Sequence, residues 1–198
     1  MTILSVNKTR EPMGAMRLFF VGTAVPIFYF TVIDMQKNVR KLTHAALIAA
    51  LYVALTHLQN MLLPGSATWA IQFRASEALC VLALFTPAAI PGLTIGCLLF
   101  NITFSGALPL DFLVGSLASF LAAWGMYLTR RVTIKGYPLL ALLLPAVSNA
   151  ILVGWELSVY IGGGFGLNAL YVAIGEAAVL LILGSALFYA LRNKGLFG

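Results

Sequence analysis

The stretch IQFRASEALCVLALFTPAAIPGLTIGCLLFN, residues 71–101, contains two apolar runs separated by the proline-containing break TPAAIPG. Pro and Gly at such a break end helices, so the stretch predicts two helices joined by a short turn. Its only charged residues are Arg74 and Glu77, three positions apart at the start of the first run. Residues three apart on a helix are neighbours, so the two charges can neutralise each other.

The composition around this stretch is that of an integral membrane protein. The chain has 198 residues, of which 61% are hydrophobic and 9% are charged, and its mean hydropathy is +0.98. Soluble domains carry roughly 25% charged residues. A chain of this length can supply about six helices of some 20 residues, the length that crosses a bilayer, with no room for a separate soluble domain.

We therefore predict an all-α integral membrane protein built as a bundle of six transmembrane helices. The breaks between the apolar runs are rich in Gly and Pro and set the approximate limits of the helices. The expected spans are residues 42–63, 72–86, 88–104, 110–128, 137–160 and 167–191.

The basic residues predict the orientation of this bundle. The net charge is +6, and the basic residues of the core gather in three groups at the ends of spans. Positive-inside signals are distributed in this way, which argues against nucleic acid as a partner. With six spans, all three groups lie on one side, so both termini of the core are predicted to be cytoplasmic. The groups are Lys37, Arg40 and Lys41; Arg130, Arg131 and Lys135; and Arg192 and Lys194.

Residues 1–34 precede the core as an N-terminal extension. Residues 17–33 are apolar but short and contain Pro26, and a span there would place three basic residues outside, against the positive-inside rule. Two interpretations stay open: an additional spanning or peripheral helix, and translation that starts at Met35. In both, residues 35–198 form the membrane domain.

The first span has two distinct faces on a helical projection. Ala46, Ala50 and Ala54 form one narrow stripe, broadened by Ala45 and Ala49. Small residues at four-residue spacing allow another helix to approach closely in lipid. The stripe is interpreted either as internal packing or as a docking surface for another membrane protein. The polar residues about 150° away, which we expect to face inward, are Tyr52, Thr56 and Gln59.

The charged residues of the spans indicate a binding site. An ionised group within a span costs several kcal/mol, so such residues normally pair or line a site. On the predicted topology they all lie in the outer half of the bilayer, which favours a pocket that opens outward. They are Arg74, Glu77, Asp111, Glu156 and Glu176, with Asn101 and Asn149 as polar neighbours and Trp69, Trp155, Tyr160 and Tyr171 as aromatic residues that can stack on a flat ligand.

The surplus of carboxylates suits a ligand that is cationic or rich in N–H donors. A carboxylate accepts two adjacent N–H groups, and an Asn side chain adds both a donor and an acceptor. The alternative is that each acid lies at a helix end and is hydrated in the headgroup region. Asp111 also has a position where an acid stabilises a helix N-terminus. The alternative for the aromatic residues is the interfacial belt.

The sequence carries no motif for enzymatic or cofactor chemistry. It has no GxxxxGK[ST] loop, so the chain cannot itself bind ATP through a P-loop. Ser116 lies in GSLAS, but both histidines, His44 and His57, are in the first span. This placement disfavours a serine nucleophile with a histidine base. Cys80 and Cys97 lie in apolar runs without metal-ligand spacing and are interpreted as core residues. We expect no catalytic residue, no metal and no cofactor.

Several motifs together resemble the queuosine-precursor transporter family (QueT), which are membrane S-components of energy-coupling factor transporters. They occur in order from Met35 to the C-terminus: the opening stretch with Q-F-R-x-S-E and P-x-x-I-P-G-L-x-x-G, then LPLDFLVGSLASFLAA, then GEAAVLLILG. By this resemblance the motif residues are Arg74, Glu77, Asn101, Asp111 and Glu176.

The resemblance implies a six-helix subunit that captures a deazaguanine base from outside the cell for ATP-driven uptake. Candidate substrates are aminomethyl-deazaguanine, its nitrile precursor and queuine, and the implied partners are a transmembrane coupling subunit and two ATPase subunits. The location implied is the plasma membrane of a bacterium. The competing interpretations are an S-component for another vitamin or nucleobase and, from other classes, a small membrane enzyme or a scaffold.

Overall fold

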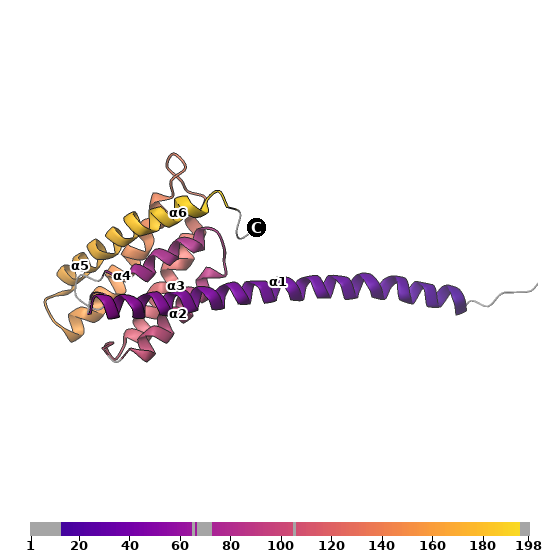
Figure 1. The fold of residues 1–198 in the computed structure, drawn as a ribbon, viewed down its shortest axis with the longest axis horizontal. Helices are drawn as coiled ribbons and strands as arrows, with labels where there is room; N and C mark the ends of the chain where they lie inside the picture. Colours follow the sequence, from indigo (N-terminus) through magenta and orange to yellow (C-terminus); the bar gives the residue numbers. More distant parts are fainter. Residues whose placement is uncertain (1–12, 65, 67–72, 105, 195–198) are drawn as a thin grey trace, which may run out of the picture. The chain divides into compact units, whose positions relative to one another are not determined.

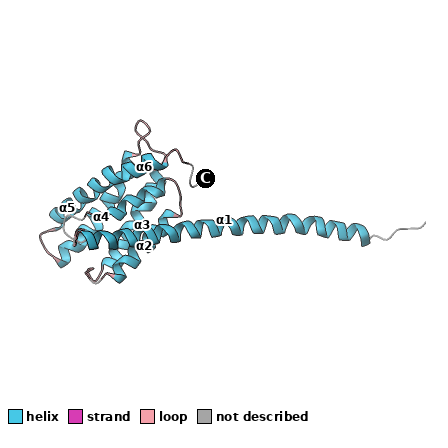
Figure 2. Ribbon diagram, in the orientation of Figure 1, coloured by secondary structure: helices cyan, strands magenta, loops and turns pink. Residues whose placement is uncertain are grey.

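The computed structural model describes residues 13–64, 66, 73–104 and 106–194, with side chains from residue 36 onward except that of residue 37. Figures 1 and 2 show that the regular structure of these residues is helical. Their one β-type contact is an isolated bridge between Ile134 and Tyr137. The chain divides into two units, Met1–Lys41 and Leu42–Gly198. The all-α prediction is confirmed, and the rest of this description concerns the second unit.

The helices follow the predicted order with one marked difference in length. Four segments are long and apolar enough to cross a membrane: Asn38–Leu62, Asp111–Thr129, Leu139–Tyr160 and Phe165–Leu191. The second and third expected spans are represented by shorter apolar helices, so six crossings and the orientation stay predictions. The elements are α1 (Met13–Leu62), η1 (Ala75–Leu84), α2 (Ala89–Thr103), α3 (Asp111–Thr129), α4 (Leu139–Tyr160), α5 (Phe165–Val179), η2 (Leu180–Gly184) and α6 (Ser185–Leu191).

The element η1 is a 3₁₀ helix, not the α-helix expected for residues 72–86. At about 2.0 Å per residue, its ten residues extend about 20 Å, whereas an α-helix of that length would extend about 15 Å. It contacts α2, α3, α4, α5, η2 and α6, so it lies at the centre of the bundle. Its small residues Ala75, Ser76, Ala78 and Ala83 suit this tighter helix to the crowded interior.

Close packing of α1 against α2 divides the alanines of the first span into two sets. A Cβ added at Gly92 would lie 2.8 Å from the carbonyl oxygen of Ala45, and one added at Gly96 would lie 3.1 Å from Cα of Ala49. These small-residue pairs bring the two backbones together, as GxxxG pairs do in membranes. Ala45 and Ala49 are accordingly buried, whereas the stripe of Ala46, Ala50 and Ala54 is exposed.

We expect Gly96→Ala to lower the free energy of unfolding by about 1–3 kcal/mol, the usual cost of overpacking a core. The new Cβ would lie 2.8 Å from Cβ of Tyr52, which is fully buried and has no room to move away. Thermal unfolding of detergent-purified protein measures the effect. The matched control is Gly166→Ala, because nothing lies within 4 Å of a Cβ at that position. Equal stability of the two variants would contradict this account of the α1 and α2 contact.

Three consecutive glycines make the turn that positions α5. Gly162, Gly163 and Gly164 have φ values of 86°, 81° and 83°, a region that side-chain-bearing residues rarely adopt. The buried Asn168 donates from Nδ2 to the carbonyl oxygen of Gly162 at 2.7 Å and ties this turn to the first turns of α5. The turn therefore fixes the start of the helix that carries Glu176.

Candidate functional site

Arg74 and Glu77 are connected inside the bundle through the hydroxyl group of Tyr52. Arg74 directly precedes η1 and Glu77 lies in its first turn. The Tyr52 hydroxyl donates to Oε1 of Glu77 at 2.6 Å and accepts from Nη1 of Arg74 at 3.3 Å. Arg74 is 7% exposed, Glu77 1% and Tyr52 0%. The charge pair of the opening stretch is therefore buried and depends on a tyrosine of α1.

Both cysteines contact this buried charge pair. Cys80 donates from Sγ to Oε2 of Glu77 at 3.3 Å, so both carboxylate oxygens of Glu77 are hydrogen-bonded. Nη1 of Arg74 lies 3.9 Å from Sγ of Cys97, and its guanidinium carbon lies 5.7 Å from the ring centroid of Phe100. The thiols are buried and free, as core residues would be, and they also complete the polar contacts of the pair.

The polar face of α1 points into the bundle, as its sequence predicted. The hydroxyl of Thr56 donates to the hydroxyl of Ser76 at 2.7 Å, and Oε1 of Gln59 accepts from the backbone nitrogen of Ala75 at 2.7 Å. The side-chain nitrogen of Gln59 also donates to the carbonyl oxygen of Phe73. These bonds satisfy backbone groups at the start of η1 and hold it against α1.

Asp111 and Asn101 join the end of α2 to the start of α3. Oδ2 of Asp111 accepts from the backbone nitrogen of Leu108 at 2.6 Å, and Nδ2 of Asn101 donates to the backbone oxygen of Asp111 at 2.7 Å. Nδ2 of Asn101 also lies 3.5 Å from Sγ of Cys97. Asp111 thus has the helix N-terminal role that its sequence position allowed, and its carboxyl group is only partly buried.

Within the described part of the chain, Glu156 and Glu176 are buried carboxyl groups with unpartnered oxygens. Glu156 is 0% exposed and Glu176 1%. Among the described residues, neither carboxylate oxygen of Glu156 and only one of the two oxygens of Glu176 has a hydrogen-bond partner. A buried polar group without a partner costs free energy that pairing would recover. These two carboxyl groups are therefore the strongest candidates for ligand contact.

Electrostatic contacts link the predicted site residues into one network. The carboxyl group of Glu176 interacts with Glu77 and Arg74 and has Asn149 of α4 as a side-chain neighbour. The carboxyl group of Glu156 interacts with Asp111 and with Arg74. One arginine therefore acts on three buried carboxyl groups, and the partly buried Asp111 acts on one of them, Glu156. The side chains come from η1, α3, α4 and α5, which are far apart in the sequence.

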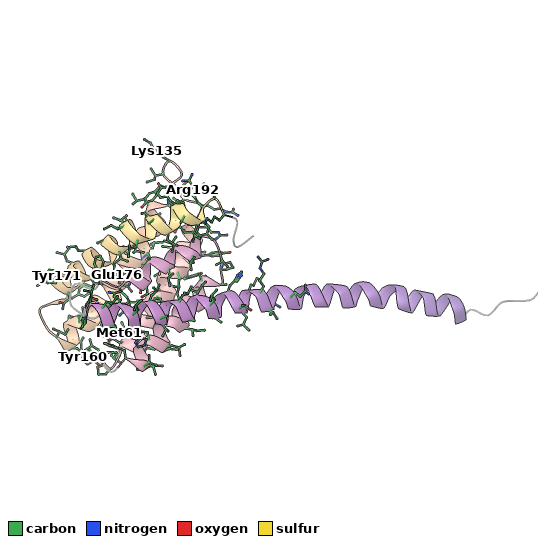
Figure 3. All side chains as sticks on the ribbon, viewed as in Figure 1. Met61, Lys135, Tyr160, Tyr171, Glu176 and Arg192 are labelled. Carbon is green, nitrogen blue, oxygen red and sulfur yellow. The ribbon has the colours of Figure 1, made fainter. Side chains whose placement is uncertain are left out.

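The predicted aromatic residues lie away from this network or outside the described residues. Tyr160 is 42% exposed and Trp155 49%, and Trp69 falls in the part of the chain that the structure does not describe. Figure 3 places Tyr160 and Tyr171 at one end of the bundle, Lys135 and Arg192 at the other, and Glu176 within it. Exposed aromatic residues at one end are typical of an interfacial belt.

Sequence reasoning missed Tyr52, Cys80 and Cys97 as members of the site. The signal for Tyr52 was its position on the polar face of the first span, opposite the alanine stripe. No spacing signal marked the cysteines, because their contacts depend on how η1 and α2 pack. Among the described residues, no group of three or more His, Cys, Asp and Glu side chains could hold a metal ion.

Comparison with known proteins gives one match. A family model described as QueT transporter matches residues 42–193, which is most of the chain. No curated protein and no solved structure gives a match. The matched region contains every described residue of the network and begins at the first residue of the second structural unit.

Proposed function

Because the chain belongs to the QueT transporter family, a family of transporters and not of enzymes, we propose that it is the substrate-binding membrane subunit, or S-component, of an energy-coupling factor importer. Its substrate is a queuosine precursor, a deazaguanine base taken up from outside the cell. The observation that carries the proposal is the pair of buried carboxyl groups with unpartnered oxygens, Glu156 and Glu176. The proposed location is the plasma membrane of a bacterium.

The chemistry of a deazaguanine base suits these carboxyl groups. The base presents adjacent N–H donors along one edge, and a carboxylate accepts two such groups side by side. Glu176 has an oxygen without a partner, and its neighbour Asn149 offers a donor for a ring carbonyl and an acceptor for a further N–H group. Binding would remove the cost of leaving a buried acceptor unpaired.

The energy for uptake would come from partner proteins. The sequence has no P-loop, so ATP hydrolysis is assigned to two ATPase subunits that act through a transmembrane coupling subunit. The exposed stripe of Ala46, Ala50 and Ala54 supports docking of that coupling subunit on α1. Small side chains there allow the close helix approach that association in lipid requires.

Ligand binding to detergent-purified protein tests the proposed function. Isothermal titration would compare the deazaguanine bases with guanine, thiamine and biotin. Submicromolar binding of a deazaguanine, with weaker binding of the other compounds, is the expected result. Tight binding of guanine, thiamine or biotin in its place would indicate an S-component for another nucleobase or vitamin. No binding of any of them would favour a scaffold or a membrane enzyme.

We expect Glu176→Gln to weaken deazaguanine binding by about 1.5–3 kcal/mol, the net value of a hydrogen bond to a charged group. The substitution preserves shape but replaces one acceptor oxygen with a donor, so it cannot accept two N–H groups. The dissociation constant measured by titration should rise roughly 10- to 150-fold. Ser158→Ala is the control, because the Ser158 hydroxyl only bonds the carbonyl oxygen of Trp155 in its own helix. Unchanged affinity in Glu176→Gln would assign Glu176 to packing alone.

A further inference from the structure

Glu156 lies beside an apolar cluster, and Arg74 is a shared and minor source of compensation for its charge. The buried residues Val153 and Leu157 flank it on α4 and form one cluster with Ala118 of α3 and Val172 of α5. Both carboxylate oxygens are buried, no donor among the described residues bonds them with good geometry, and their side-chain hydrogen-bonding neighbour is a second acid, Asp111. Removing a carboxylate from water costs several kcal/mol unless it is paired, so a cation or a strong donor bound here would stabilise its charged form.

Close packing of α4 against α5 fixes the backbone next to Glu156. A Cβ added at Gly154 would lie 2.7 Å from Cα and 2.9 Å from the backbone nitrogen of Ala169, so α4 and α5 are in direct backbone contact two residues before Glu156. Such contact holds this part of α4 in place. The carboxyl group is therefore kept inside the bundle and not at its surface.

The charged groups that face Glu156 make the local charge negative. Asp111 at the start of α3 is a second acid, and it already uses Oδ2 to accept from the backbone nitrogen of Leu108. Arg74 also acts on Glu156, but its Nη1 donates to the Tyr52 hydroxyl, and Glu77 and Glu176 share the same guanidinium. Arg74 is therefore shared among Glu77, Glu156 and Glu176, and Glu156 has a second acid, Asp111, beside it.

We propose that Glu156, supported by Asp111, is an ammonium-binding subsite that recognises the protonated amine arm of the substrate. This inference rests on the proposed function. In it, Glu176 and Asn149 bind the N–H edge of the base, and Glu156 binds the amine. Asn149 and Glu156 are seven residues apart on α4, which is two turns and about 10 Å along the axis. A bicyclic base with an aminomethyl arm has a comparable length. The transporter therefore prefers aminomethyl-deazaguanine to the nitrile-bearing base, whose arm is uncharged.

Titration of the purified protein with the two bases tests this preference without any mutation. The wild-type protein should bind aminomethyl-deazaguanine at least tenfold more tightly than the nitrile-bearing base. If both bind with equal affinity, the ammonium subsite is wrong while the proposed function stands. If neither binds, the proposed function itself fails. The two failures are thus distinguishable in one experiment.

The isosteric substitution Glu156→Gln tests whether Glu156 binds the amine. We expect the affinity for the aminomethyl base to fall at least tenfold and that for the nitrile-bearing base to change less than threefold. An equal loss for both bases would show a structural role and would overturn the assignment. Asp111→Asn should give a smaller loss in the same direction, because Asp111 is partly exposed and its Oδ2 already accepts from the backbone nitrogen of Leu108.

A metal cation would satisfy the same carboxyl groups, so the experiment includes a sodium arm. Thermal unfolding is measured in sodium chloride and in N-methylglucamine chloride, without substrate, for the wild-type protein and for Glu156→Gln. If sodium stabilises the wild type but not Glu156→Gln, and the two bases bind equally, the occupant is a metal ion and the ammonium assignment is wrong. Stability that does not depend on sodium, together with preference for the amine, supports it.

Discussion

Replacement of Arg74 with methionine is expected to lower the free energy of unfolding by about 3–5 kcal/mol, the usual cost of removing one partner of a buried ion pair. Among the described residues, Arg74 is the cation that acts on the buried carboxyl groups of Glu77, Glu156 and Glu176. Its loss leaves three buried acids to repel one another in a medium of low dielectric. Methionine fills much of the same volume, so the expected loss of stability comes from the missing charge and not from a cavity.

A second substitution separates this electrostatic effect from a general loss of packing. In Arg74→Met with Glu77→Gln, one of the opposing charges is removed, and part of the lost stability should return. Arg130→Met is the matched control: Arg130 directly follows α3, and its guanidinium lies 3.7 Å from the ring centroid of the half-buried Tyr127 in the last turn of that helix. We expect a change within about 1 kcal/mol there, as for other surface charges. Thermal unfolding in detergent measures all three variants, and a stable Arg74→Met protein would contradict the network described above.

Ala50→Trp is expected to reduce ATP-dependent uptake at least tenfold while leaving substrate binding intact. Ala50 lies at the centre of the exposed stripe and is on the opposite face of α1 from Tyr52 and Thr56. A tryptophan there would hold apart two helices that must approach closely, since small side chains make such contacts possible in lipid. The proposed ligand site, formed by Asn149 and Glu156 of α4 and Glu176 of α5, does not include Ala50 and keeps its contacts.

The measurement combines uptake in cells or proteoliposomes that contain the coupling and ATPase subunits with titration of the purified variant. Ala186→Trp is the matched control, because Ala186 is an exposed alanine of α6 that faces away from the bundle core. It should transport at the wild-type rate. Wild-type uptake by Ala50→Trp would remove the docking role from the stripe, and loss of binding in that variant would show that the substitution disturbs the site.

Much of the architecture follows from local properties of the sequence. Hydropathy and length predicted the all-α membrane class, and the Gly and Pro breaks placed α3 and α4 within a few residues of their observed limits. The opposite faces of the first span predicted that Tyr52 and Thr56 would lie inside, where both are 0% exposed. The motifs of the opening stretch identified the transporter family that the family model also matches.

Other features depended on contacts between residues distant in the sequence. Spacing alone suggested that Arg74 and Glu77 neutralise each other directly, but the Tyr52 hydroxyl, 22 and 25 positions away, lies between them. Spacing also could not show which alanines of the first span are buried. Ala45 and Ala49 are covered because Gly92 and Gly96 of α2 pack against them.

The sequence by itself therefore determined the membrane class, the helical content, the inward face of α1 and the family, because hydropathy, helix period and motif order are properties of neighbouring residues. Only the tertiary structure decided that η1 is a central 3₁₀ helix, which alanines of α1 stay exposed, and which acid is left without a partner. Among the described residues, donors bond both oxygens of Glu77, whereas the side-chain neighbour of Glu156 is another acid, Asp111. That difference arises because hydrogen-bond partners come from whichever helices pack together, and packing is a property of the whole fold.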